Sequence, residues 1–347
     1  MLLWSELYKL RFYHSIFEIV VGIMSYVVNA LLIYMALYKS NRYMRAYRVI
    51  IVMNCCVDLF YNTISICIQV VVDMKDGGLY FMNGYFLEQV PQPYACYMHN
   101  FWMFGLLIAV LNVPVQFIFR YCILCKNRVL TAKELCAILA GPAILVALHC
   151  CYGVKAYMVD EKHRQQAIGS LQKDPLWGDD VPVFSHGYVK DYPVQIDFLG
   201  SQGVVVLAYA VIFYTGKQIY SKLKASQSIM SAQTKLAQSQ LSKILLIESA
   251  MPFLVMGVPI TFCIIAVICE FNIPLIGLFM ATTASCIPLV NGICIIIIVP
   301  SYRRCFKQMI FMKADSSKTD STMGQATVAF ITAIPMKRKV EPATSNY

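Results

Sequence analysis

Charged side chains are scarce in this chain. Lys, Arg, Asp and Glu together make up 14% of the residues, whereas hydrophobic types make up 59%. A soluble domain of this composition would have too few polar groups to cover its surface, so an ordinary water-soluble protein is excluded. The formal net charge is +10, but no zinc-ligand spacing, basic recognition helix or basic-aromatic strand accompanies it. This argues against nucleic-acid binding.

Catalytic and metal-binding motifs are also lacking in the sequence. The histidines form no H-x-x-x-H pair, and no nucleophile elbow is present. The chain shows neither an internal repeat nor paired helices broken by Gly or Pro, both of which are typical of transporters. We therefore expect no enzyme activity, no cofactor and no metal. A seven-span transporter or ligand-gated channel is the alternative to a receptor.

Long apolar stretches are what the chain has in abundance. Each exceeds the about 20 residues that a helix needs to cross a bilayer. They cover 12–37, 47–72, 97–124, 135–158, 194–220, 244–269 and 274–299. They predict an all-α membrane protein, a seven-transmembrane helix bundle in one receptor domain over 1–312. The polar, Ser/Thr-rich residues 313–347 are expected to form a disordered cytoplasmic tail.

Loop charges predict the orientation of this bundle. The loop after span one carries four cations and no acid: Lys39, Arg42, Arg45 and Arg48. The loops after spans three and five are also basic, whereas the alternate loops are acidic or mixed. Because Lys and Arg mark the cytoplasmic side, the N-terminus is expected outside and the C-terminus inside. After span seven, RRCFKQMIFMK predicts a short amphipathic helix on the membrane lipid, with Cys305 a candidate for acylation.

Polar side chains inside the spans are costly in hydrocarbon and tend to face the bundle interior. In span two they recur every three or four residues, which places them on one helix face. These residues are Asn54, Asp58, Asn62, Ser65 and Gln69. Span three carries a second stripe, formed by Asn112, Gln116 and Arg120.

Three of the polar residues within the spans are expected at a similar depth. Asn29, Asp58 and Asn291 would lie about 13–17 Å from the inner ends of their helices, at 1.5 Å per residue. They either share one buried hydrogen-bond network or each binds a local partner. The first alternative would compensate the carboxylate of Asp58, which is expensive to leave unpaired in hydrocarbon.

Four segments of the chain resemble G-protein-coupled receptors. NCCVDLFYN in span two and FRYCIL closing span three are similar to that superfamily. QLSKILLIESAMPFLVMGVPI leading into span six and IPLVNGICIIIIVPSYRR in span seven are similar, more narrowly, to the nematode serpentine chemoreceptors. The resemblance covers nearly the whole chain apart from the tail, and class delta is the most similar subfamily.

This resemblance implies a chemosensory receptor, with olfaction as one role. It would lie in the plasma membrane of a sensory-neuron cilium and bind a small external cue in the outer half of the bundle. Displacement of span six would then signal to a heterotrimeric G protein. Phe119 stands before Arg120, where rhodopsin-like receptors usually have an acid. We expect Arg120 to anchor to carbonyls or to an acid of span six, with Glu248 the nearest candidate, or else to reach the interface alone.

The expected ligand cavity combines aromatic surface with a few polar groups, which is the usual lining of a small-molecule site. The candidate lining residues are His99, Trp102, Met103, Gln202, Thr282 and Thr283. Helix packing is the alternative for each of them. Glu18, Asp197 and Glu270 are expected at the membrane interface and not as ligand counter-ions.

The loop at 159–193 contains no cysteine, so the bridge that usually joins it to span three cannot form there. Cys96 either reaches Cys150 or Cys151 near span four, or remains a free thiol. The loop itself either covers the cavity or is solvated and only partly ordered.

Epitope tags at the two ends test the predicted orientation. A tag before Met1 should be stained on intact cells, and a tag after Tyr347 only after permeabilisation. A cytosolic marker stained in parallel verifies that intact cells exclude the antibody. Staining of both tags from the same face would contradict an odd number of spans.

Overall fold

The computed structural model of the chain describes residues 2–39, 47–158, 161–172, 181–225, 232–254, 258, 261, 265 and 276–315. Contacts divide the chain into two units, Met1–Tyr302 and Arg303–Tyr347. The first unit contains the helix bundle. A final helix, α11 (Pro300–Asp315), starts at the end of the first unit and continues in the second, where the sequence predicts an amphipathic helix.

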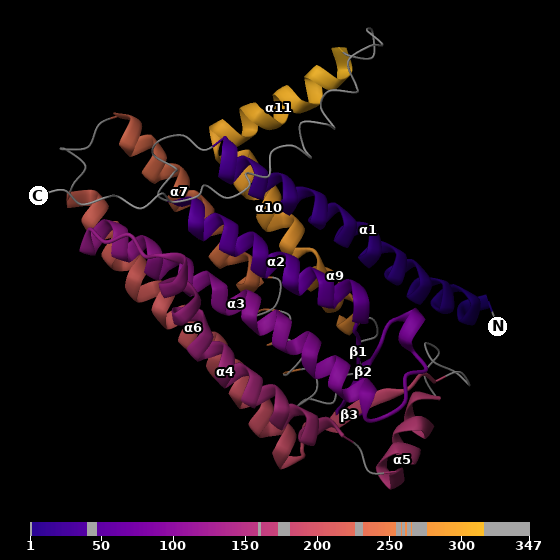
Figure 1. The fold of residues 1–347 in the computed structure, drawn as a ribbon. Coiled ribbons are helices and arrows are strands. Elements are labelled where there is room, and N and C mark those ends of the chain that lie inside the picture. The colour runs from indigo at the N-terminus through magenta and orange to yellow at the C-terminus, as the bar shows by residue number, and fades with distance from the viewer. Residues whose placement is uncertain are drawn as a thin grey trace, which may run out of the picture. The chain divides into compact units, whose positions relative to one another are not determined.

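Long helices make up most of the first unit (Figure 1). Five described helices are apolar and long enough to cross a membrane: α1 (Leu2–Tyr38), α2 (Arg48–Ile68), α3 (Tyr94–Lys126), α4 (Ala132–Tyr157) and α6 (Tyr192–Ala225). α9 (Ile276–Ser285) and α10 (Ile287–Ile298), bent by 41° at their junction, pass the same test when the two helices are counted together as one span. α7 (Ala232–Pro252) enters predicted span six, most of whose remainder up to residue 269 lies outside the described residues.

α3 occupies the middle of the bundle and packs against α2, α4 and α6. Gly105 allows the close approach to α2, because a Cβ atom there would lie 2.9 Å from Ile64 Cδ1. The outward faces of α4 and α6 carry exposed apolar side chains such as Leu148 and Phe213. Water cannot solvate such a face favourably, whereas lipid can, so these helices suit a membrane environment.

A three-stranded antiparallel sheet lies at one end of the bundle, which we call the sheet end; the opposite end, near Arg120, is the Arg120 end (Figure 1). Its order is β1 (Val71–Lys75), β2 (Gly78–Met82) and β3 (Phe184–Tyr188). Asp76 and Gly77 join β1 to β2, with φ angles of 50° and 72°. Positive φ at both positions is the geometry of the two-residue turn that matches the twist of a hairpin.

The sheet corrects the predicted extent of span two. That span was expected to reach residue 72, but α2 ends at Ile68 and β1 begins at Val71. Gln69 adopts a left-handed conformation with φ 52°, and its backbone N–H donates to the Ser65 carbonyl, which closes the helix. The following β-branched valines favour a strand, and the pairing with β2 decides their conformation.

The sheet packs on the bundle with little space between them. β1 lies against α9, where any Cβ atom at Gly277 would collide with the carbonyl oxygen of Val72. Every residue of β2 is buried. The loop that was expected either to cover a cavity or to be solvated contributes α5 (Glu161–Leu171) and the buried strand β3. Its described part is therefore ordered and covers the sheet end of the bundle.

His186 makes this sheet sensitive to acid. Its ring stacks on Tyr80 with centroids 5.2 Å apart, and burial lowers the pKa of His186 from 6.5 to about 4. When β3 separates from the sheet, the imidazole of His186 therefore binds protons more readily than it does in the folded sheet. The contribution of His186 to stability is complete above the unfolded pKa of 6.5 and is lost as the pH falls towards about 4.

Hydrogen exchange of the β2 and β3 amides measures this effect. At about pH 5, after correction for intrinsic rates, protection should be lower than at about pH 7. The variant His186→Phe keeps an aromatic ring without a titrating group and should lose the difference. Equal protection of the unaltered protein at both pH values would contradict the role of His186.

Candidate functional site

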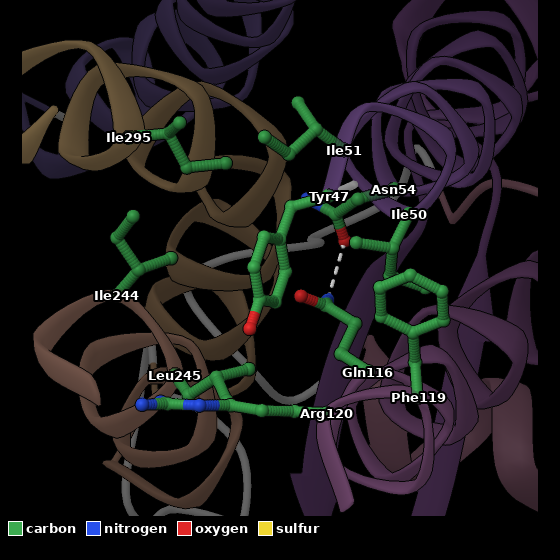
Figure 2. Close-up of a pocket in the computed structure, with 10 residues that line it drawn as sticks. All are labelled: Tyr47, Ile50, Ile51, Asn54, Gln116, Phe119, Arg120, Ile244, Leu245 and Ile295. Carbon is green, nitrogen blue, oxygen red and sulfur yellow. Dashed lines mark hydrogen bonds between the residues drawn. The ribbon is translucent and has the colours of Figure 1, made fainter. Parts of the chain in front are cut away.

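A small cavity opens in the Arg120 half of the bundle, between α2, α3, α7 and α10 (Figure 2). Its volume is about 30 Å³, enough for a water molecule. Its lining residues are Tyr47, Ile50, Ile51, Asn54, Gln116, Phe119, Arg120, Ile244, Leu245 and Ile295. Ile244 and Ile295 line one side of it and Ile50 and Phe119 the other. Asn54, Gln116 and Arg120 supply polar groups.

Arg120 connects α3 to α7 beside this cavity. It is 3% exposed, and its Nη2 donates to the Gln238 carbonyl at 2.9 Å and to Ser242 Oγ at 2.7 Å. The Gln238 side chain also accepts from Arg120 at 3.2 Å and donates to the hydroxyl of Tyr47 at 3.4 Å. The cation is therefore held by neutral oxygens, including the backbone carbonyl that was one of the predicted alternatives.

Glu248, the other predicted partner of Arg120, lies on α7 six residues beyond Ser242. This separation is about 9 Å along a helix axis. The side chain of Glu248 lies outside the part that the structure describes. Gln238 and Ser242 were not predicted as partners, although their spacing of four residues places both on one face of the same helix.

Asn54 and Asp58 together join α2 to two other helices through hydrogen bonds. Its side-chain oxygen accepts from Asn112 Nδ2 at 2.6 Å and from Gln116 Nε2 at 2.8 Å. Its amide nitrogen donates to Asp58 Oδ2 at 3.3 Å, and Asn291 Nδ2 donates to Asp58 Oδ1, also at 3.3 Å. The two predicted polar stripes and span seven therefore meet in one buried network, which we call the Asn54 network.

The remaining polar residues of span two bind closer to the sheet end. Asn62 Nδ2 donates to the Gly22 carbonyl at 3.0 Å, and Gln69 Nε2 donates to the Ser15 carbonyl at 3.2 Å. Asn29, expected at the depth of Asp58, donates instead to the carbonyl of Pro288 at 3.2 Å. These bonds attach α1 to its neighbours through backbone acceptors. Asn29 also donates to the Ser25 carbonyl of its own helix at 3.0 Å, whereas Asp58 and Asn291 share the Asn54 network.

His99 and Phe81 meet at the sheet end. Their rings stack with centroids 3.8 Å apart, and Tyr157 contacts both rings edge-on. Both ring nitrogens of His99 are buried without a hydrogen-bond partner among the described residues. Phe81 and Tyr157 were not predicted, because only the strand pairing reveals that Phe81 faces α3.

The other predicted ligand contacts have packing roles in the structure. Trp102 is buried in the main apolar core and Met103 packs against it. Thr282 and Thr283 donate to carbonyls of their own helix, at 2.7 Å and 3.0 Å. Gln202 is half-buried on α6. Hydroxyl groups that bond their own helix have no donor left for a ligand unless that bond breaks.

The thiols of Cys96, Cys150 and Cys151 are free in the structure. Cys96 Sγ lies 3.7 Å from the carbonyl oxygen of Val154, one helical turn beyond Cys150. Cys96 therefore faces α4, as the disulfide hypothesis required, but contacts its backbone instead of a cysteine. Cys305 on α11 is a half-buried free thiol.

Two of the three acids predicted at the interface lie inside the bundle. Glu18 is only 2% exposed and is buried among the helices. Asp197 Oδ1 lies 3.4 Å from His149 Nε2, and Oδ2 accepts from the Tyr157 hydroxyl at 3.2 Å. Glu270 lies outside the described residues. The sequence did offer a signal for the contact of Glu18 with His14, because residues four apart on a helix lie on the same face and their side chains can meet.

The fold of the described helices is similar to that of a rhodopsin. Squid rhodopsin, solved by crystallography, is similar with a TM-score of 0.56 and 13% sequence identity, over 97% of this chain and 90% of that chain. The family model for the serpentine-type seven-transmembrane G-protein-coupled chemoreceptor Str matches residues 14–307. The chain belongs to this family.

These comparisons confirm the predicted fold class and the resemblance to serpentine chemoreceptors. The chain is a multi-pass membrane receptor. The matching model is that of Str, and it does not support the narrower resemblance to class delta. No curated protein is significantly similar to the chain in sequence.

Removing Asn54 should destabilise the bundle. In Asn54→Leu, Asn112 and Gln116 lose their common acceptor, and each buried orphan costs about 1–3 kcal/mol. We expect a lower apparent Tm in detergent, measured by fluorescence-detected size-exclusion chromatography after heating. Cys56→Leu, an exposed site on the same helix, is the matched control. Equal thermal stability of the two variants would contradict a structural role for the Asn54 network.

Proposed function

We propose that the chain is a plasma-membrane chemoreceptor that binds a small external cue at the sheet end and signals to a heterotrimeric G protein at the Arg120 end. Membership of the Str family supports the receptor and chemosensory part. The basic loops support an N-terminus outside the cell, which places the sheet outside as well. A sensory-neuron cilium is the location that this role favours.

The cue meets the aromatic groups around His99. Phe81, His99 and Tyr157 provide flat apolar surface, and the unpartnered nitrogens of His99 provide a hydrogen-bonding group. This chemistry suits a small apolar or amphiphilic molecule with one polar group. The stacked contact between Phe81 and His99 must open to admit it, so cue binding is linked to movement of β2.

The contact of Arg120 with α7 is the observation that carries the signalling proposal. Phe119 stands where a neighbouring acid would restrain the guanidinium, and it packs edge-on against Tyr47 instead. The restraint then consists of hydrogen bonds to neutral acceptors on α7, which we call the Arg120 latch. Such bonds are worth about 1.5–3 kcal/mol each. A ligand with a modest preference for the open state can release them.

Release of the latch moves span six and uncovers Arg120. The Asn54 network lies between the two ends, because Gln116 and Arg120 are one turn apart on α3. Asn291 attaches the same network to span seven. Movement of α3 or α10 at the sheet end therefore changes the geometry of the latch.

Weakening the latch should raise basal signalling. Ser242→Ala removes the 2.7 Å bond from Arg120 and should increase cue-independent nucleotide exchange on the G protein several-fold. Ser239→Ala changes an exposed serine of the same helix and serves as the control. Both variants are compared at equal surface expression.

Basal activity of Ser242→Ala equal to that of Ser239→Ala would contradict the latch. Cue-evoked current or flux in cells that lack G proteins would contradict the receptor mechanism itself and favour a channel or transporter. Nucleotide-sensitive coupling that follows the cue supports it.

A further inference from the structure

A second buried polar group lies in the sheet half of the bundle, where α1 meets α2 and α9. It consists of His14, Glu18, Tyr61, Ser65 and Ser285, which we call the Glu18 cluster. The side chains of His14 and Glu18 are 3% and 2% exposed, and Tyr61 is fully buried. None of these residues belongs to the Asn54 network or to the Arg120 latch.

Ser285 has one hydroxyl hydrogen and two acceptors within reach. Its Oγ lies 2.7 Å from Glu18 Oε1 and 3.1 Å from the carbonyl oxygen of Ala281. Ser65 Oγ lies 2.9 Å away and can donate to Ser285. An ionised carboxylate is the stronger acceptor, so it takes the hydrogen from Ser285. A neutral carboxyl competes less well, and the hydrogen then returns to Ala281.

The position of Ser285 gives this competition a structural consequence. Ser285 is the last residue of α9, and α10 begins at Ile287 after the 41° bend. The N–H of Cys286 donates to the Thr283 carbonyl at 3.2 Å, a tight turn at the bend. On one side of the bend α9 contacts β1, and on the other Asn291 binds Asp58. A change at Ser285 therefore acts on the segment between the sheet and the Asn54 network.

Several atoms of the cluster have no hydrogen-bond partner among the described residues. They are Glu18 Oε2, both ring nitrogens of His14 and the Tyr61 hydroxyl. His14 Nε2 lies 3.4 Å from Glu18 Oε1, close enough for an ion pair when the imidazole is protonated. An unpaired carboxylate in hydrocarbon costs far more than its neutral form. The cluster thus contains vacant acceptors and a strong reason to bind a positive charge.

Two groups of the described part that face Glu18 from neighbouring elements carry no positive charge. Tyr61 on α2 and Cys286 at the α9–α10 junction face Glu18, and neither carries a cation. Arg11, one turn before His14 on α1, donates to Glu88 at 2.7 Å. His14 is a basic group in direct contact with Glu18.

We propose that the Glu18 cluster is a proton-binding site, and that its occupancy sets the bend of span seven. A proton from external water binds Glu18 Oε2 and forms the O–H bond of a neutral carboxyl. The hydrogen bond from Ser285 to Oε1 weakens, and the Ser285 hydrogen turns to the Ala281 carbonyl. The proton is thus a second ligand that adjusts the receptor independently of the cue.

Infrared titration of the full chain in lipid nanodiscs tests the binding step. Over about pH 5 to 9, the band of a protonated carboxyl in the unaltered protein should gain intensity as the pH falls and lose it as the pH rises. Glu18→Gln should lose that titrating component. Glu88→Gln, at a carboxylate of the same region paired with Arg11, is the matched control and should keep it. A spectrum of the unaltered protein that does not change with pH, or one that Glu18→Gln leaves intact, would overturn the proposal.

Hydrogen exchange at the bend tests the coupling. At one fixed pH, Glu18→Gln, which resembles the neutral acid, should accelerate exchange of the amides of residues 286, 287, 289 and 290 by about tenfold relative to Glu88→Gln. In Ser285→Ala the carboxyl band should still titrate. The amide exchange rates at the α9–α10 bend, however, should no longer change with pH in step with that band. The unaltered protein gives a test that does not depend on the folding of any variant. After correction for intrinsic rates, its amide exchange at the bend should change over the same pH range as the carboxyl band. Titration without any change in exchange would overturn the link to span seven.

Neither measurement uses G-protein activity. Failure of the signalling proposal would leave both results unchanged, so the two proposals can fail separately.

Discussion

The amide oxygen of Asn54 accepts hydrogen bonds from Asn112 and Gln116, and its amide nitrogen donates to Asp58. A buried polar group left without a partner is costly in hydrocarbon, so these side chains pair with one another, within α2 and across to α3. The choice of partners fixes the rotation of α2 against α3 and, through Asn291, of α10 against α2. The latch, the sheet and the Glu18 cluster all depend on helices held in that rotation.

The two ends of the bundle are held together by different kinds of contact. At the Arg120 end, a cation is held by the neutral oxygens of Gln238 and Ser242. At the sheet end, aromatic stacking of Phe81 on His99 and strand pairing hold the covering sheet in place. Span seven, bent beside Ser285, connects the sheet with the Asn54 network.

Several features were predictable because they are local. The interval of three or four residues placed the span-two polar residues on one face, and all five are buried. A backbone carbonyl was one of the alternatives expected for Arg120, and Arg120 binds that of Gln238, which precedes the predicted start of span six on α7. The sheet was not predictable in the same way. Val71 and Val72 look like a continuation of an apolar span, and only pairing with β2, followed by β3 from a distant loop, makes them a strand.

The sequence alone determined that the chain crosses a membrane as helices and which helix faces carry polar groups, because hydropathy and helical period are properties of neighbouring residues. The tertiary structure decided which of those groups meet. It buried Glu18 beside Ser285, turned Asn29 to the Pro288 carbonyl and placed Phe81 over His99. Such contacts join residues far apart along the chain, and they form only when side-chain packing sets how each helix lies against the next.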